Sequence, residues 1–203
     1  MTSYKYGLTP VLIADNVKLK ASELCFVQYL PIKMPQSDIR IPDNLKWTKP
    51  LVNLTSFLED DYIYLTAKHL FVTKGSVGNR PGWHCDGFLS EDWNYLWSDS
   101  VPTEFCIQDF DLTMDHEISM QEMEDQVIPD NIITYPNNTF LALDQHVVHR
   151  PSIAKESGFR TFVKISISTE RYNLEGNAHN YLFGDYNWDM IKRKEYRNHP
   201  IGK

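Results

Sequence analysis

The chain has 203 residues, of which 42% are hydrophobic and 23% charged, a globular balance that excludes an intrinsically disordered protein. Its 20 Lys and Arg against 27 Asp and Glu give a formal net charge of −7, which disfavours a protein that coats extended nucleic acid through bulk electrostatics. The sequence lacks a run of about 18 apolar residues, so we expect no membrane span.

Length and cysteine content narrow the class of protein further. The length allows a sizeable core, so we expect one domain over residues 1–203. Three cysteines without paired spacing fit neither a disulfide framework nor a zinc ribbon, and they favour a reducing compartment. The N-terminal stretch lacks the features of a signal peptide. We therefore expect a cytoplasmic protein.

Short runs rich in β-branched and aromatic residues, bounded by Pro, Gly, Asn or Asp, dominate the chain and predict strands. Helical periodicity is weaker and is confined to residues 45–58, which Pro50 interrupts, and residues 188–196. Many short strands with little helix between them predict a mainly β fold, either a sandwich or a barrel. In chain order, the predicted strands are residues 6–13, 23–30, 62–72, 104–110, 131–135, 139–143 and 160–168.

Two segments between these strands have the composition of loops. Residues 73–82 contain three glycines and a proline. Residues 111–130 are acidic and show no strand pattern, which predicts a solvated excursion or a short helix. A lid over a functional site is the alternative for this acidic segment.

His84-Cys85-Asp86 follows the glycine-rich loop directly. In an extended segment the side chains of His84 and Asp86 share a face, and Cys85 points away. An imidazole and a carboxylate side by side suit a first-row divalent metal. With one more histidine they make the two-histidine, one-carboxylate triad of non-haem Fe(II) oxygenases.

The third histidine is expected at the end of a later strand. His149 lies there and is favoured over its neighbour His146, because the two cannot share a face in an extended chain. Arg160 opens the next apolar strand, where its planar guanidinium can bind a carboxylate through two hydrogen bonds. A cosubstrate with a keto acid at one end and a carboxylate at the other would span the metal and Arg160, and 2-oxoglutarate has that shape.

The pattern His84-x-Asp86, then His149, then Arg160 resembles the Fe(II)- and 2-oxoglutarate-dependent oxygenase superfamily over about residues 62–168. The resemblance implies a double-stranded β-helix, or jelly-roll barrel, with residues 62–168 as its core. N- and C-terminal extensions and a few peripheral helices would surround it. It also implies that dioxygen is consumed, that 2-oxoglutarate is decarboxylated to succinate, and that the substrate is oxidised, most simply by hydroxylation.

The sequence departs from one common form of this pattern. Many relatives have Arg-x-Ser, in which the serine also holds the cosubstrate carboxylate, whereas Phe162 stands at that position here. Alternation along the strand places Lys164 on the same face as Arg160, as a second candidate cation. Tyr64 and Thr66, on a neighbouring predicted strand, are candidates for the missing hydroxyl.

Candidates for substrate binding flank the metal ligands. The aromatic residues Trp83 and Phe88 could line an apolar pocket or could be ordinary packing. The polar candidates are Asn79, Arg80 and Arg150, and arginines there would suit an anionic substrate. The small size of the chain favours a small molecule or a single exposed residue as the substrate.

Two other functions stay open. One is a β-barrel of the same lineage that has lost catalysis and serves as a binding or structural module. The other is a cupin-like metalloenzyme that does not use 2-oxoglutarate. Arg160 discriminates between them and the oxygenase, because an arginine that does not face the metal would weaken the keto-acid hypothesis.

Overall fold

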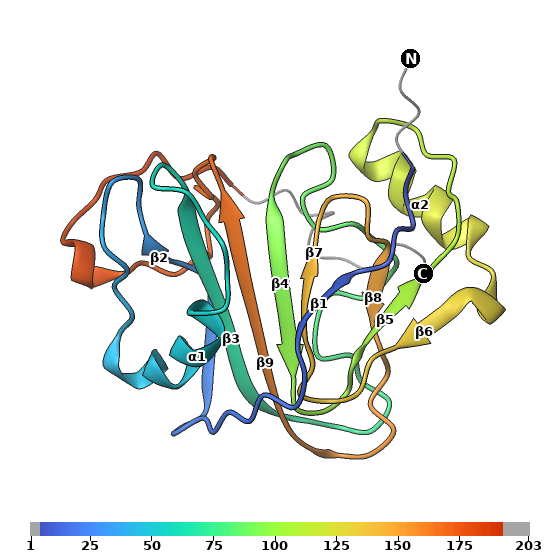
Figure 1. The fold of residues 1–203 in the computed structure, drawn as a ribbon, viewed down its shortest axis with the longest axis horizontal. Coiled ribbons are helices and arrows are strands. Elements are labelled where there is room, and N and C mark those ends of the chain that lie inside the picture. Colours follow the sequence, from blue (N-terminus) through green and yellow to red (C-terminus); the bar gives the residue numbers. More distant parts are fainter. Residues whose placement is uncertain (1–4, 193–203) are drawn as a thin grey trace.

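The computed structural model describes residues 5–192, and within that range it is mainly β (Figure 1). In the described residues, β1 to β9 pair with one another in antiparallel fashion and form two sheets. The large sheet has the order β1-β7-β4-β9-β3-β2, and the small sheet has the order β6-β5-β8. Their bounds are β1 Val11–Ala14, β2 Cys25–Lys33, β3 Tyr62–Val72, β4 Trp93–Ser98, β5 Thr103–Cys106, β6 Ile132–Thr134, β7 Phe140–Leu143, β8 His149–Pro151 and β9 Gly158–Ser168.

The order of the strands between residues 62 and 168 identifies the fold. A bridge between His84 and His149 adds one further short strand position to the small sheet, beside β8. The chain then runs through the large sheet (β3), the small sheet (His84), the large sheet (β4), the small sheet (β5, β6), the large sheet (β7), the small sheet (β8) and the large sheet (β9). This alternation of eight antiparallel positions between two sheets is that of a jelly roll, so the predicted double-stranded β-helix is confirmed.

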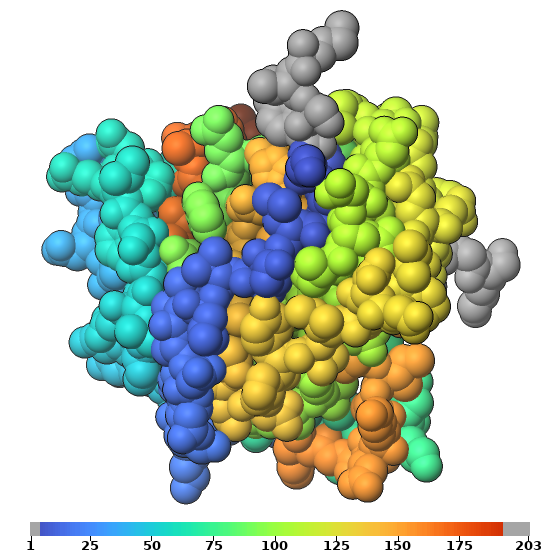
Figure 2. Space-filling model, turned by 45° about the vertical axis from the view of Figure 1, so that its right-hand side comes forward, coloured from blue at the N-terminus to red at the C-terminus, as the bar shows by residue number. Residues whose placement is uncertain are grey.

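The segments before β3 widen the large sheet at both of its edges. β1 pairs with β7, and β2 pairs with β3. The N-terminal segment, blue in Figure 2, runs across the surface on its way to β1. It is tied down where Gly7 donates its N–H to the carbonyl of His146 at 2.7 Å. The expected strands 6–13 and 23–30 therefore exist, with shifted bounds.

Helices are few and short. A 3₁₀ turn, η1 (Asp43–Thr48), leads into α1 (Lys49–Val52), which has Pro50 in its first turn, where proline is tolerated. The helix expected over 45–58 is therefore only four residues long. Within residues 5–192 the longest helix is α2 (His116–Gln126), and two further 3₁₀ turns are η2 (Pro129–Asn131) and η3 (Tyr181–Phe183). The helix expected over 188–196 is not present in its described part, residues 188–192, and the rest lies outside the described residues.

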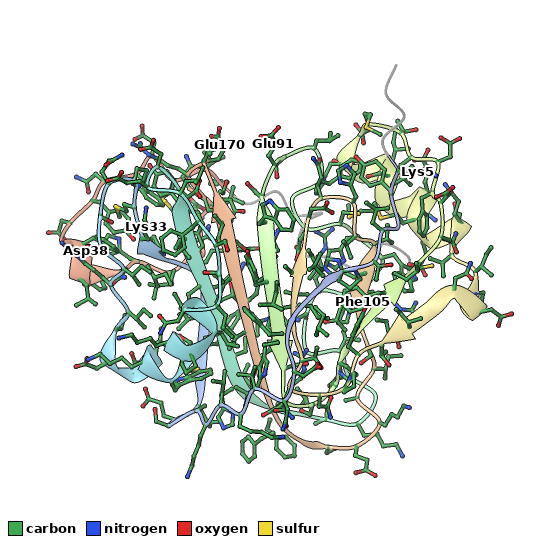
Figure 3. The ribbon with its side chains drawn as sticks, in the orientation of Figure 1. Lys5, Lys33, Asp38, Glu91, Phe105 and Glu170 are labelled. Atoms are coloured by element: carbon green, nitrogen blue, oxygen red, sulfur yellow. The ribbon has the colours of Figure 1, made fainter. Side chains whose placement is uncertain are left out.

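The two faces of the large sheet differ in chemistry. One face of β9 carries Val163, Ile165 and Ile167, which are buried together with Leu51 and Val52 of α1. The other face carries Arg160, Phe162, Lys164 and Ser166 and looks into the space between the sheets. Phe162 packs there with Phe105 of β5, labelled in Figure 3. The interior between the sheets is thus apolar in part and polar next to Lys164.

Candidate metal centre

Two histidines are brought together by a pair of backbone hydrogen bonds. His84 donates its N–H to the carbonyl of His149 at 3.0 Å, and His149 donates to the carbonyl of His84 at 2.9 Å. Directly opposite residues in such a pair project to the same side of the sheet, and the two imidazole centroids are 4.5 Å apart. Asp86, two residues after His84, joins them. One ligand atom from each of the three residues lies within 4.8 Å of the other two.

Both imidazoles present the same nitrogen to the cluster. The Nδ1 of His84 lies 2.9 Å from the carbonyl oxygen of Gly82, and the Nδ1 of His149 lies 3.0 Å from that of Val147. A carbonyl can only accept, so each Nδ1 carries the proton and each Nε2 keeps its lone pair. Metal-ligating histidines are usually oriented in this way.

The protonation states also suit a metal. Burial, followed by the neighbouring His149, lowers the pKa of His84 to about 4, so this imidazole is neutral at physiological pH. Burial alone would raise the pKa of Asp86, but the ammonium of Lys164 outweighs it and holds this pKa well below its usual range. Neutral imidazole and ionised carboxylate are the forms that bind metal ions.

Asp86 is shared between the histidines and a lysine. Its Oδ2 lies 3.4 Å from the Nε2 of His149, and its Oδ1 lies 2.7 Å from the Nζ of Lys164. Lys164 also donates to the hydroxyl of Tyr29 at 3.3 Å. The carboxylate therefore has one oxygen held by an ammonium group and one facing the imidazoles. Two neutral imidazole nitrogens and one carboxylate oxygen fit a first-row divalent ion such as Fe(II).

The competing histidine lies elsewhere. The Nδ1 of His146 is 3.3 Å from the Oδ2 of Asp144, and its ring packs at 5.2 Å from the ring of Tyr6. Among the described residues that could hold a metal ion as a group, His149 joins His84 and Asp86, and His146 does not.

A cavity of about 720 Å³ adjoins the cluster. Thr66 of β3 and Lys164 of β9 line one side, and four residues of α2 line another. The acidic segment 111–130 therefore contains a short helix, one of the two forms expected, and this helix forms a cavity wall. Residues 171–174, just after β9, complete the wall near the end of the large sheet that Glu91 and Glu170 mark in Figure 3. The α2 residues are His116, Ser119, Met120 and Met123.

The residues expected at a cosubstrate carboxylate are not all in the cavity. Lys164 and Thr66 line it, and the Oγ1 of Thr66 accepts a hydrogen bond from the backbone of Tyr29. Tyr64 is not among the residues that line the cavity. Its hydroxyl donates to the carbonyl of Glu170 at 2.9 Å and accepts from the N–H of Tyr172 at 3.0 Å. Tyr64 therefore anchors the segment that follows β9.

Arg160 lies just behind the cavity wall. It is 3% exposed and is not among the residues that line the cavity. Its guanidinium stacks on the ring of Phe162, 4.8 Å from the ring centroid. Its Nε donates to the carbonyls of Ser100 and Val101, whereas its Nη2 is buried without a hydrogen-bond partner. Burial lowers its pKa to about 10, although Asp99 acts in the opposite direction.

Lys68 is a cavity residue that sequence reasoning missed. It lines the cavity from β3, and its Nζ donates to the Oδ1 of Asn79 at 2.7 Å and to the carbonyl of Gly78 at 3.4 Å. Burial, then Arg160 and Lys164, lower its pKa to about 8. The signal was present, because alternation along a strand places Lys68 on the face of Tyr64 and Thr66.

The predicted substrate residues divide into two groups. Asn79, Arg80 and Phe88 line the cavity. Trp83 is 2% exposed, and the guanidinium of Arg150 stacks on its ring, 4.4 Å from the ring centroid. Arg150 in turn forms an ion pair with Glu104 at 2.7 Å. Trp83 and Arg150 therefore pack against each other and are not among the residues that line the cavity.

Comparisons with known proteins add little to this geometry. No family model and no curated protein matches the sequence. Crystal structures of EvdO2 from Micromonospora carbonacea var. aurantiaca, one of them complexed with 2-oxoglutarate, match with 13% sequence identity and a TM-score of 0.38. The match covers 63% of this chain and 60% of the EvdO2 chain. None of the helices in residues 5–192 is long and apolar enough to cross a membrane.

Proposed function

We propose that this protein is a non-haem Fe(II)- and 2-oxoglutarate-dependent dioxygenase that hydroxylates a small molecule or a single exposed residue. The observation that carries the proposal is the cluster of His84, Asp86 and His149 on the wall of a cavity in a double-stranded β-helix. Three protein ligands on one side leave positions open for other ligands, which is the arrangement of non-haem Fe(II) oxygenases.

Each cluster residue has a defined task in this proposal. The Nε2 atoms of His84 and His149 and the Oδ2 of Asp86 would hold the iron. Iron with 2-oxoglutarate supplies the activation of dioxygen that couples decarboxylation of the keto acid to oxidation of a C–H bond. Lys164 keeps the second oxygen of Asp86 engaged, so the carboxylate offers a single oxygen to the metal.

The charges near the cluster support an anionic cosubstrate. Lys164, Lys68 and Arg160 come from the neighbouring strands β3 and β9, and of these three only Lys164 has a carboxylate within salt-bridge distance among the described residues. The guanidinium of Arg160 is buried behind Phe162 and its Nη2 has no hydrogen-bond partner, so its positive charge acts on the cavity with little screening. We therefore propose that Arg160 and Lys164 both contribute to the field that holds 2-oxoglutarate.

The size of the cavity supports a further occupant. Ligand pockets for small molecules are typically about 300–1,000 Å³, and this cavity of about 720 Å³ has room for a substrate beside the five-carbon cosubstrate. Asn79, Arg80 and Phe88 are proposed to contact that substrate. The helix α2 shields one side of the cavity and would limit access of water.

The test uses the purified chain under anaerobic conditions. Addition of Fe(II) and then 2-oxoglutarate should produce the visible charge-transfer absorption of the iron chelate, and dioxygen should then release succinate. His149→Ala should lose iron binding and both signals, whereas His146→Ala, the matched control three residues earlier, should keep them. If the wild type binds iron but shows neither signal, the oxygenase proposal fails, and a binding module becomes the better hypothesis.

A further inference from the structure

We propose that Asp92 forms a cation site in the cavity and that this site binds a protonated amine of the substrate. The proposal names the substrate class of the proposed oxygenase, and in that respect it rests on the proposed function. The site itself rests on the contacts, burial and position of Asp92.

Asp92 is a largely buried carboxylate on the cavity wall. It stands directly before β4, lines the cavity and is 9% exposed. Its Oδ2 accepts a hydrogen bond from the hydroxyl of Tyr172 at 2.7 Å. Among the described residues nothing donates to its Oδ1, and this atom is not one of their fully buried atoms without a partner. Oδ1 is therefore open to the cavity.

The charge of Asp92 has no counterpart in residues 5–192, where no lysine, arginine or histidine nitrogen lies within salt-bridge distance of it. Lys164, which lines the same cavity, is engaged with Asp86 at 2.7 Å. Arg171, also in the lining, donates its Nε to the hydroxyl of Tyr62 at 3.0 Å. A largely buried carboxylate without a cation is costly, and a ligand cation would relieve that cost.

Tyr172 supplies a hydrogen bond but no charge. Burial, and then the carboxylate of Asp92, raise the pKa of this phenol, so it stays a neutral donor. A hydroxyl group of a ligand would likewise donate to Oδ1 without compensating the charge, whereas a protonated amine does both. Aromatic rings also favour a nearby cation, and the rings of Tyr172 and Tyr29, 5.2 Å apart, both line the cavity. These contacts select an amine.

Gly87 brings Asp92 close to the metal cluster. It follows Asp86 directly and has a φ of 72°, and a Cβ placed on it would lie 3.0 Å from the Cβ of Asp92. The same Cβ would lie 2.9 Å from the Oγ of Ser90. Because this position has no side chain, the loop after the metal ligand can pack against Asp92. An amine bound at Asp92 therefore lies beside the cluster.

The charges of the cavity are separated along the strands. Leu96 of β4 pairs with Lys164 of β9, and the two strands are antiparallel. Asp92 stands four residues before Leu96, and Arg160 stands four residues before Lys164. They therefore lie on opposite sides of Lys164, and the register of β3 places Lys68 on the side of Arg160. An anionic cosubstrate is drawn to the cationic side, which leaves the side of Asp92 for a cationic substrate.

The experiment uses the full chain, freed of metal with a chelator, and titrates two matched pairs of probes by ligand-observed NMR. The pairs are butylamine with butanol and benzylamine with benzyl alcohol. Both members of a pair have the same carbon skeleton, and only the amine is charged at neutral pH. Wild type should bind each amine at least about tenfold more tightly than its alcohol, because the amine gains a charge-assisted hydrogen bond.

Two substitutions locate the preference. Asp92→Asn keeps the shape of the side chain and an acceptor for Tyr172 but removes the charge, so it should abolish the preference for amines. Asp92→Ser is the second uncharged variant if Asp92→Asn fails to fold. Glu91→Gln removes the neighbouring exposed carboxylate, labelled in Figure 3, and should leave the preference unchanged.

The comparison of amine with alcohol in wild type needs no variant, so it is decisive by itself. The proposal is overturned if wild type binds neither amine, if it binds the alcohols as tightly, or if an uncharged variant at position 92 keeps the preference. A protein that gives the iron chelate signal but shows no preference for amines would refute this inference and leave the proposed function intact. A preference that depends on Asp92, without the chelate signal, would do the reverse.

Discussion

Replacing Lys164 by methionine should destabilise the protein without metal and make it respond more strongly to metal. Lys164 and Asp86 are 2.7 Å apart, with side chains 10% and 17% exposed, so the variant leaves a largely buried carboxylate without its ammonium partner. Removing one partner of a buried ion pair costs about 3–5 kcal/mol. Entry of water from the adjoining cavity can offset part of this loss, so the lower end is expected. A loss of ~3 kcal/mol lowers the Tm of a chain of this size by roughly 6–12 °C.

The response to metal has the opposite sign. In the wild type the ammonium of Lys164 repels a divalent ion at the same carboxylate, whereas in the variant the ion is the only strong positive partner of Asp86. Manganese(II), which binds similar ligands without reacting with dioxygen under the assay conditions, should therefore raise the Tm of Lys164→Met by more than that of wild type. Asp86→Asn in the same background should remove both the instability and the metal response. Equal melting temperatures without metal, or a smaller manganese shift in the variant, would refute the reasoning.

Three further predictions concern charge, capping and backbone space. Affinity for the proposed cosubstrate, 2-oxoglutarate, should fall as pH rises through about 8, where Lys68 on the cavity wall loses its proton, while Arg160 and Lys164 on β9 stay charged; calorimetry from pH 7 to 9 with manganese(II) present measures it, and Lys68→Arg should give a flat profile. Asp115 accepts from the N–H groups of Glu117 and Ile118 at the start of α2, so Asp115→Ala should cost about 1 kcal/mol in urea unfolding. Asp125→Ala near the other end of α2 is its control and should cost less, because acids there oppose the helix dipole. Gly7→Ala should cost more than about 1 kcal/mol, since the new Cβ would lie 1.8 Å from the carbonyl oxygen of Gln108. Gly75→Ala has a similar positive φ and open space around it, so it separates the clash from the backbone strain.

The parts of the molecule that sequence predicted well are those governed by local rules. β3 has the predicted bounds, 62–72, because a long run of β-branched and aromatic residues is bounded by polar turns. His84 and Asp86 share a face because they are two apart. β8 was missed because three residues between turns carry no alternation. β4 is not among the predicted strands, although its aromatic residues Trp93, Tyr95 and Trp97 alternate along the chain. The expectation of one domain over residues 1–203 stays a prediction.

The less predictable parts depend on register between distant segments. Alternation placed Arg160 and Lys164 on one face, but it could not say which lines the cavity, because that depends on their rows relative to β3. Lys68 was overlooked although alternation alone places it on the face of Tyr64 and Thr66. Trp83 and Arg150 flank the ligands in sequence yet pack against each other, since successive strand residues point to opposite sides. α2 was ambiguous from sequence, because only three of its residues are buried.

The two histidines of the cluster are oriented by peptide carbonyls, those of Gly82 and Val147. Every amino acid carries such a carbonyl, so no single substitution at these positions can delete the acceptor. The orientation of both Nε2 atoms is therefore set by the path of the main chain and not by the identity of any neighbouring side chain. A lineage of this protein could exchange most of its cavity lining, and with it the molecule it acts on, while inheriting the donor geometry unchanged.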